Sequence, residues 1–90
     1  MKTYLIGYDL NAPGKKYVNL HKKIRSLGSW WHRLGSTWLV ACELTPAKIR
    51  DALKPFLDSN DELLVVRVTK KAVWLGFERD RNWLQAHIGR

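Results

Sequence analysis

Two stretches of the sequence, Thr37–Cys42 and Leu63–Val68, are apolar on both faces of the strand that each one predicts. Their apolar side chains occupy odd and even positions alike, and the second stretch is rich in β-branched residues. Because neighbouring side chains of a strand point to opposite faces, such strands belong to a sheet that is buried on both sides. Each face of the sheet must therefore be covered by other residues.

The other segments alternate between strand and helix patterns. They are strands at residues 3–8 and 29–34, and helices at residues 15–27 and 46–54. Thr45 and Pro46 are typical of a helix start, and Pro55 ends regular helix near Lys54. The order strand, helix, strand, strand, helix, strand predicts an α+β fold of the ferredoxin-like type, βαββαβ. Short connections then place the first and fourth strands at the centre of the sheet.

The C-terminal part of the chain lies outside this pattern. We expect a core at residues 1–69 and an extension at residues 70–90, which forms an extra strand at Ala72–Phe77 and then a short helix. Two helices cover only one face of a four-stranded sheet, and a bare second face would expose more apolar area than monomers usually tolerate. The extension, a second copy of the chain, or both must cover it. We expect a homodimer.

Composition restricts the partners. The 90 residues carry a net charge of +8 at a sequence pI near 10, which favours polyanions, nucleic acid first and an anionic membrane second. The single cysteine, Cys42, excludes an intrachain disulfide, and the Cys and His spacing does not suggest zinc. The N-terminal run is unlike a signal peptide, and no apolar run approaches the roughly 18 residues of a membrane span. We expect a cytoplasmic protein that does not bind membranes.

Asp9 stands where the first predicted strand ends. A carboxylate at this point is held by the sheet and still reaches solvent, which suits a metal ligand or a general base. Ser36, at the end of the predicted hairpin, is placed to hydrogen-bond a phosphate oxygen. In the alternative, Asp9 only caps the turn that follows by accepting hydrogen bonds from its backbone amides. Both interpretations stay open at the level of sequence.

Cations gather on the first predicted helix, its entry loop and the strand that follows. They are Lys15, Lys16, Lys22, Lys23, Arg25 and Arg33. Lys and Arg contacts to phosphates require no base sequence, and they predict binding that weakens steeply with salt. The alternative is a solvated helix face that only keeps the protein in solution.

Five tryptophans are many for a chain of this length. Tryptophan buries a large area at interfaces and also stacks on unpaired bases, so this content is compatible with a protein partner or with nucleic acid. Most of the five are expected to pack in the core. Trp30 and Trp31 are neighbours in one predicted strand, so one of them must lie on a more exposed face.

Several of these features recur together, in the same order, in a known group of proteins. They are Tyr8-Asp9-Leu10, the basic helix ending at Leu27-Gly28, the run Ser36-Thr37-Trp38-Leu39-Val40, and Asn60-Asp61-Glu62 leading into Leu63–Val66. In these features the chain, from Met1 to about Thr69, resembles the small CRISPR-associated dimeric endoribonucleases and the virulence-associated protein D toxins. It looks most similar to their uncharacterised SinR-labelled relatives.

The resemblance implies a homodimer whose two sheets face each other, with the strand at Ala72–Phe77 pairing with the partner's sheet. It also implies that Asp9 and its symmetry mate hold Mg²⁺ in a phosphodiesterase site. The function expected on these grounds is a nucleic-acid-binding homodimer with magnesium-dependent endonuclease activity, in which Asp9 and Ser36 are catalytic. The alternative is a non-catalytic nucleic-acid-binding protein, or a toxin-type module whose Trp-rich surface binds another protein.

Overall fold

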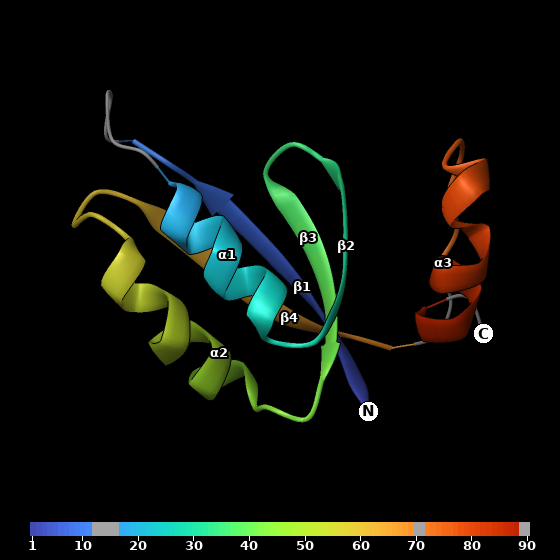
Figure 1. Cartoon of the computed structure of the whole chain (residues 1–90), viewed down its shortest axis with the longest axis horizontal. Coiled ribbons are helices and arrows are strands. Elements are labelled where there is room, and N and C mark those ends of the chain that lie inside the picture. The colour runs from blue at the N-terminus through green and yellow to red at the C-terminus, as the bar shows by residue number, and fades with distance from the viewer. Residues whose placement is uncertain (12–16, 70–71, 89–90) are drawn as a thin grey trace.

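The computed structural model describes residues 1–11, 17–69 and 72–88. It is an α+β structure built on one four-stranded sheet of order β2-β3-β1-β4, in which every neighbouring pair is antiparallel (Figure 1). The strands are β1 Lys2–Asp9, β2 Ser29–Leu34, β3 Thr37–Cys42 and β4 Glu62–Val68.

The central strands of the sheet are β1 and β3, so the expectation that the fourth strand is central was wrong. The β2–β3 hairpin places β3 beside β1, and the chain then crosses through a helix to the free side of β1. This crossover leaves β4 as an edge strand whose outer backbone groups face away from the sheet.

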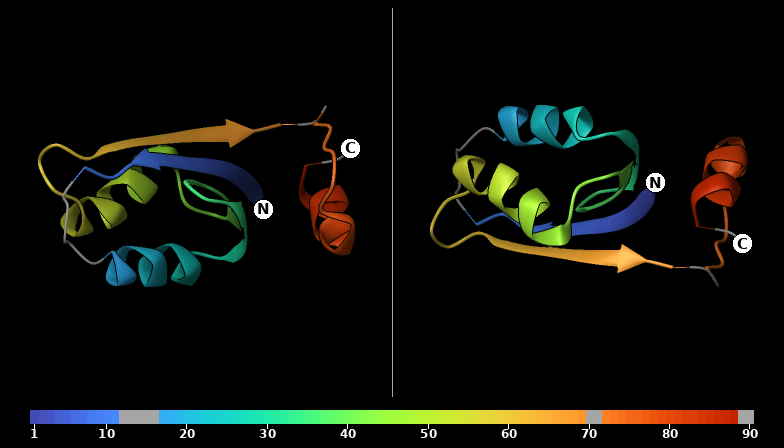
Figure 2. Two further views of the ribbon diagram at one scale, coloured as in Figure 1. Left: turned by 90° about the horizontal axis from the view of Figure 1, so that it is seen from above. Right: turned by 90° about the horizontal axis from the view of Figure 1, so that it is seen from below.

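Two helices cover one face of the sheet (Figure 2), namely α1 Val18–Ser26 and α2 Pro46–Leu53. The α2 start is as expected, because the Thr45 hydroxyl accepts a hydrogen bond of 3.2 Å from the backbone N–H of Lys48. The end of α2 is also as expected, since the chain passes into a 3₁₀ turn, Lys54–Phe56, at Pro55.

The main core lies between these helices and the sheet. Its fully buried members come from every layer: Tyr4, Ile6, Leu20, Ile24, Trp38, Val40, Ile49 and Leu53. Leu20 and Ile24 are one turn apart on α1, and Ile49 and Leu53 repeat this spacing on α2, so each helix buries a single stripe. The Tyr4 hydroxyl is satisfied inside this core by donating to the Leu44 carbonyl at 2.6 Å.

The C-terminal segment covers part of the second face. After a 3₁₀ turn at Glu78–Asp80, the helix α3 Arg81–His87 buries Leu84 against Trp31 and Leu39. The short helix expected at the C-terminus is thus present. It is tied to β1 by the Thr3 hydroxyl, which donates to the His87 carbonyl at 3.2 Å.

The described residues 72–77 form no strand within the single chain, so the extra strand expected at Ala72–Phe77, which was to pair with a partner's sheet, stays a prediction. Gly76 and Phe77 both adopt positive φ, 80° and 57°, and turn the chain toward α3. Such backbone cannot continue a strand. The turn places Phe77 edge-on against Trp31, with 5.1 Å between the ring centroids.

The second face stays open on the side of β4. Leu64 and Val66 are 60% and 44% exposed, whereas the apolar side chains of the central strands are buried or half-buried. Val73 and Leu75, in the segment before the turn, are 97% and 95% exposed. The expectation that both faces are apolar is therefore correct, and the single chain covers only part of the second one.

Candidate nucleic-acid interface

The α1 helix carries three of the expected phosphate-binding cations. Because Leu20 and Ile24 point into the core, Lys22 and Arg25 fall on the exposed side, and Lys23 is half-buried between the two sides. None of the three cations forms an ion pair with another described residue. Lys15 and Lys16 lie outside the described residues.

Charge is segregated along the fold. No Asp or Glu lies between Leu10 and Cys42, so α1, β2 and β3 contain no carboxylate side chain, whereas α1 and β2 carry cations. The acidic residues belong to the end of β1, to the stretch from Glu43 to Glu62, and to the C-terminal segment. Among the described residues, the cations of this carboxylate-free stretch are Lys22, Lys23 and Arg25 on α1 and Arg33 on β2.

Arg33 is engaged elsewhere. Its guanidinium binds Asp80 through two hydrogen bonds, Nε to Oδ2 at 2.8 Å and Nη2 to Oδ1 at 3.3 Å. The hydrogen bond from Arg33 lowers the pKa of the Asp80 carboxyl, and the same bond raises the pKa of the guanidinium. Arg33 thus helps to dock the C-terminal segment on the hairpin and is not a free cation of the interface.

A cluster of aromatic rings joins α1 to the hairpin. The buried Trp38 indole donates to the Tyr8 hydroxyl at 2.9 Å, and that hydroxyl lies 3.1 Å from Nε2 of His21. His32 stacks on Trp38 with 3.8 Å between ring centroids and a 10° interplanar angle, and His21 lies 6.0 Å from His32. The arrangement brings together two of the three histidines, which are eleven residues apart in sequence.

Hydrogen bonds orient both imidazoles. The Gly35 carbonyl can only accept, so Nε2 of His32, which lies 2.9 Å away, carries a proton. The Tyr8 hydroxyl accepts from Trp38 and also bonds Nε2 of His21, and the tautomer of His21 decides which of these two groups donates. Burial lowers the pKa of His21, and the neighbouring His32 and Arg25 lower it further, which keeps this ring neutral near pH 7.

The expected catalytic residues meet at one end of the sheet. Asp9 is exposed at the end of β1, and the Ser36 carbonyl in the hairpin turn accepts a 3.1 Å hydrogen bond from the N–H of Tyr8, the residue before it. Directly opposite Asp9 on β4 stands Glu62, which the sequence reasoning missed. Asp9 and Glu62 border an open surface depression of about 420 Å³ that reaches Leu64, and Ser36 is not part of its lining.

The turn after β1 is held by another acid. The backbone N–H of Asn11 donates to Asp61 at 2.7 Å, and the Asn11 amide donates to the Asn60 carbonyl at 3.0 Å. Asp61 also accepts from the Tyr17 hydroxyl at 3.0 Å. Asp61 therefore accepts the hydrogen bond from the backbone N–H of Asn11. For this amide it fills the capping role that the sequence suggested for Asp9.

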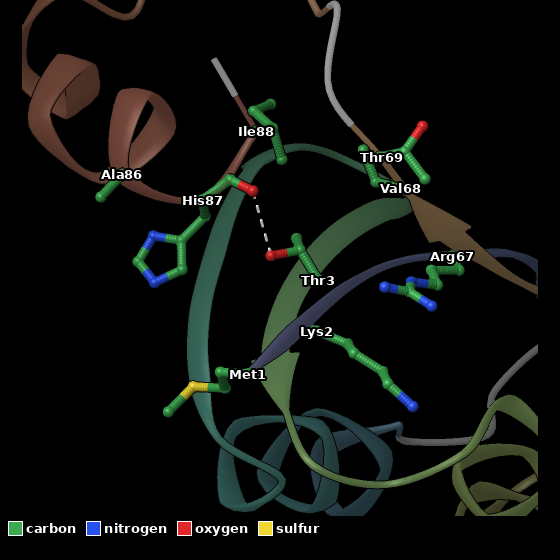
Figure 3. A pocket seen from close by; sticks show the side chains of 9 residues that line it. All are labelled: Met1, Lys2, Thr3, Arg67, Val68, Thr69, Ala86, His87 and Ile88. Carbon is green, nitrogen blue, oxygen red and sulfur yellow. Dashed lines mark hydrogen bonds between the residues drawn. The ribbon is translucent and has the colours of Figure 1, made fainter. Parts of the chain in front are cut away.

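A second cavity, of about 200 Å³, lies at the opposite end of β1 and β4 (Figure 3). Lys2 and Arg67 extend on one side of β1, while Thr3 reaches toward the end of α3 on the other. The His87 carbonyl, at the end of α3, lies at this cavity, and a helix C-terminus disfavours anions. We therefore do not assign the cavity to the nucleic-acid interface.

Metal ligands are sparse within a single chain. Among the described residues, no group of three or more His, Cys, Asp or Glu side chains could hold a metal ion. Cys42 is buried in the main core, as its strand pattern indicated. Across residues 1–11, 17–69 and 72–88, no helix has the length and apolar character needed to cross a membrane.

No protein-family model matches the chain, and no solved structure matches it.

Proposed function

We propose that this chain is a nucleic-acid-binding protein of ferredoxin-like fold that acts as a homodimer. The observation that carries the proposal is the segregation of charge, because α1 presents Lys22, Lys23 and Arg25 within a stretch, Leu10 to Cys42, that contains no carboxylate. Phosphates are the ligands that such a surface attracts. The strand order β2-β3-β1-β4, with both α1 and α2 on one face, supports the fold assignment.

Exposed apolar side chains support the homodimer. Leu64 and Val66 lie on the face of the sheet away from α1 and α2, at the β4 edge. Val73 and Leu75 add an exposed apolar segment close in sequence to β4. A second copy of the chain that packs on this face would bury all four and remove the free edge of the sheet.

A second candidate function, magnesium-dependent phosphodiester cleavage, is favoured by the pairing of Asp9 with Glu62. Side chains directly opposite each other on antiparallel strands have Cβ atoms about 5 Å apart, so two carboxylates repel each other there unless a cation lies between them. By the alternation of side chains along β1 and β4, both point to the face away from α1 and α2, and a dimer whose two-fold axis passes beside them would gather four carboxylates.

The donor set fits Mg²⁺, which binds through one or two carboxylates together with waters and phosphate oxygens. Asp9 and Glu62 would hold the ion, and a Ser36 hydroxyl would hydrogen-bond a phosphate oxygen. Bound Mg²⁺ would neutralise charge that develops on the phosphate and lower the pKa of water at the site.

The binding proposal is tested by removing the α1 cations together. In the variant Lys22→Gln/Lys23→Gln/Arg25→Gln, we expect the affinity for a labelled RNA or duplex DNA to fall by about tenfold or more. The slope of log K against log salt should decrease by about two to three, because up to three phosphate contacts are lost. Fluorescence anisotropy at several salt concentrations measures both quantities.

The matched control removes three cations from outside the carboxylate-free stretch, in the variant Lys48→Gln/Arg50→Gln/Lys54→Gln on α2 and the 3₁₀ turn. It has the same net charge as the α1 variant and should bind almost as well as the wild type. Equal losses in the two variants would mean that net charge alone drives binding, against the proposed interface.

The cleavage proposal is tested with Asp9→Asn and Glu62→Gln in the presence of Mg²⁺ or a chelator. Each variant should cut RNA or DNA about a hundredfold more slowly than the wild type while keeping its affinity, and the chelator should have the same effect. Glu43→Gln, an exposed acid at the other end of the sheet, is the control and should cut normally. Equal residual cleavage by all proteins would indicate contamination and contradict the catalytic role.

A further inference from the structure

Trp30 is an exposed aromatic ring in the carboxylate-free stretch of the chain. It lies on the edge strand β2 and is 43% exposed, whereas its neighbour Trp31 is buried on the other face. The Arg25 guanidinium lies 5.9 Å from the centre of the Trp30 ring. The proposed function uses the cations around this ring and leaves the ring itself without a role.

The ring continues into an aromatic strip made of Trp30, Trp38, His32 and His21. Trp30 contacts Trp38 at 5.5 Å between centroids, and His32 stacks on the same indole. Trp30 and His32 are two positions apart on β2, so they lie on one side of the strand, next to α1. The strip thus combines π faces with imidazole nitrogens, of which Nδ1 of neutral His32 is left as an acceptor.

We infer that Trp30, together with Arg25 and His32, binds an unpaired nucleobase, so that the protein prefers single-stranded nucleic acid to duplex. This inference rests on the proposed function. In a duplex, neighbouring base pairs already cover both faces of each base, and only an unpaired base can stack on a side chain. Arg25 lies beside the ring and Lys22 and Lys23 belong to the same helix, so these cations would meet the phosphates that flank the stacked base.

The charge around the ring favours nucleic acid over a protein partner. Interface cores between proteins are depleted in charged residues, whereas α1 brings Lys22, Lys23 and Arg25 to this region. An acidic polypeptide is the protein-type ligand that would fit these cations. It is therefore included in the test as polyglutamate.

The first measurement compares a labelled 12-nucleotide RNA with the same RNA in a duplex. The wild type should bind the single strand more tightly. Trp30→Leu, which keeps an apolar side chain but removes the π face, should weaken single-strand binding about 5- to 100-fold and leave duplex binding unchanged. Trp30→Phe should keep much of the single-strand affinity that Trp30→Leu loses. Leu34→Ala, which removes an exposed apolar residue of the same strand, is the matched control and should bind normally.

The second measurement does not depend on polymer binding. Titration with AMP should shift the indole N–H resonance of Trp30 in NMR spectra, and ribose 5-phosphate, which lacks the base, should not. The resonance is assigned by its absence in Trp30→Leu. Circular dichroism confirms that each variant is folded.

The outcomes separate this inference from the proposed function. If Trp30→Leu binds single strands as tightly as the wild type while the α1 triple variant no longer binds them, the base site is overturned and the proposed function stands. If neither RNA nor DNA binds, the proposed function fails and the preference for single strands fails with it, even where AMP shifts Trp30. A Trp30 resonance that responds to polyglutamate and not to AMP overturns the base site.

Discussion

Trp38→Ala should lower the free energy of unfolding by about 3–5 kcal/mol, which is the usual cost of truncating a fully buried aromatic residue. Trp38 is the largest side chain with no exposed surface, and it lies in the main core between the sheet and α1. Its removal would leave a cavity and would also remove the indole N–H from which the Tyr8 hydroxyl accepts, so that hydroxyl would keep only its bond to His21. Urea unfolding followed by circular dichroism measures the loss.

The expected loss is a large share of the total stability. Small domains unfold with about 5–15 kcal/mol, and a chain of 90 residues buries a modest core. Trp38→Phe separates the two contributions, since it keeps much of the packing and removes the indole N–H. Trp30→Ala is the exposed control and should cost less than about 1 kcal/mol. A Trp38→Ala variant as stable as Trp30→Ala would contradict the position of Trp38 in the core.

Local pattern alone predicted much of the fold. The bounds of β2 and β3 are those expected, because Gly35 and Ser36 interrupt two strongly apolar runs. The start of α2 followed from Thr45 and Pro46. The alternation of side chains along a strand also predicted that one of two adjacent tryptophans would be exposed, and Trp30 is that one.

Features that depend on pairing between distant segments could not be read in this way. The edge position of β4 follows from the crossover through α2, which no local signal specifies. The Ala72–Phe77 segment has strand composition, but positive φ at Gly76 and Phe77 ends it. Here the packing of Phe77 on Trp31 overrides a local preference.

The candidate site likewise contains residues that local sequence predicts and residues whose position depends on pairing between distant segments. Asp9 was found because a carboxylate at a strand end is a local feature. Glu62 was missed because its position opposite Asp9 depends on the register between β1 and β4. Arg33 was included among the free cations because its partner, Asp80, is 47 residues away. The sequence placed Glu62 just before the fourth predicted strand. That position points to Asp9 only when the order of the strands in the sheet is known.

Gly28→Ala should destabilise the protein by about 3 kcal/mol or more, although Gly28 itself is exposed. A Cβ atom on Gly28 would lie 2.1 Å from the carbonyl oxygen of Ala41 and 3.0 Å from Cβ of Cys42. The obstructing atom is backbone, so no side-chain rotation can relieve the contact. The β2–β3 pair would have to separate where Ser29 faces Ala41.

The control is Gly35→Ala, because nothing lies within 4 Å of a Cβ at that position. Its effect should stay within about 1 kcal/mol in the same urea titration. Gly28→Ala should also disturb binding, since Gly28 connects α1 to β2 and thereby sets the distance between the α1 cations and Trp30. A Gly28→Ala protein with wild-type stability would show that the α1–β2 connection packs less tightly on β3, and the relative placement of these groups would then have to be revised.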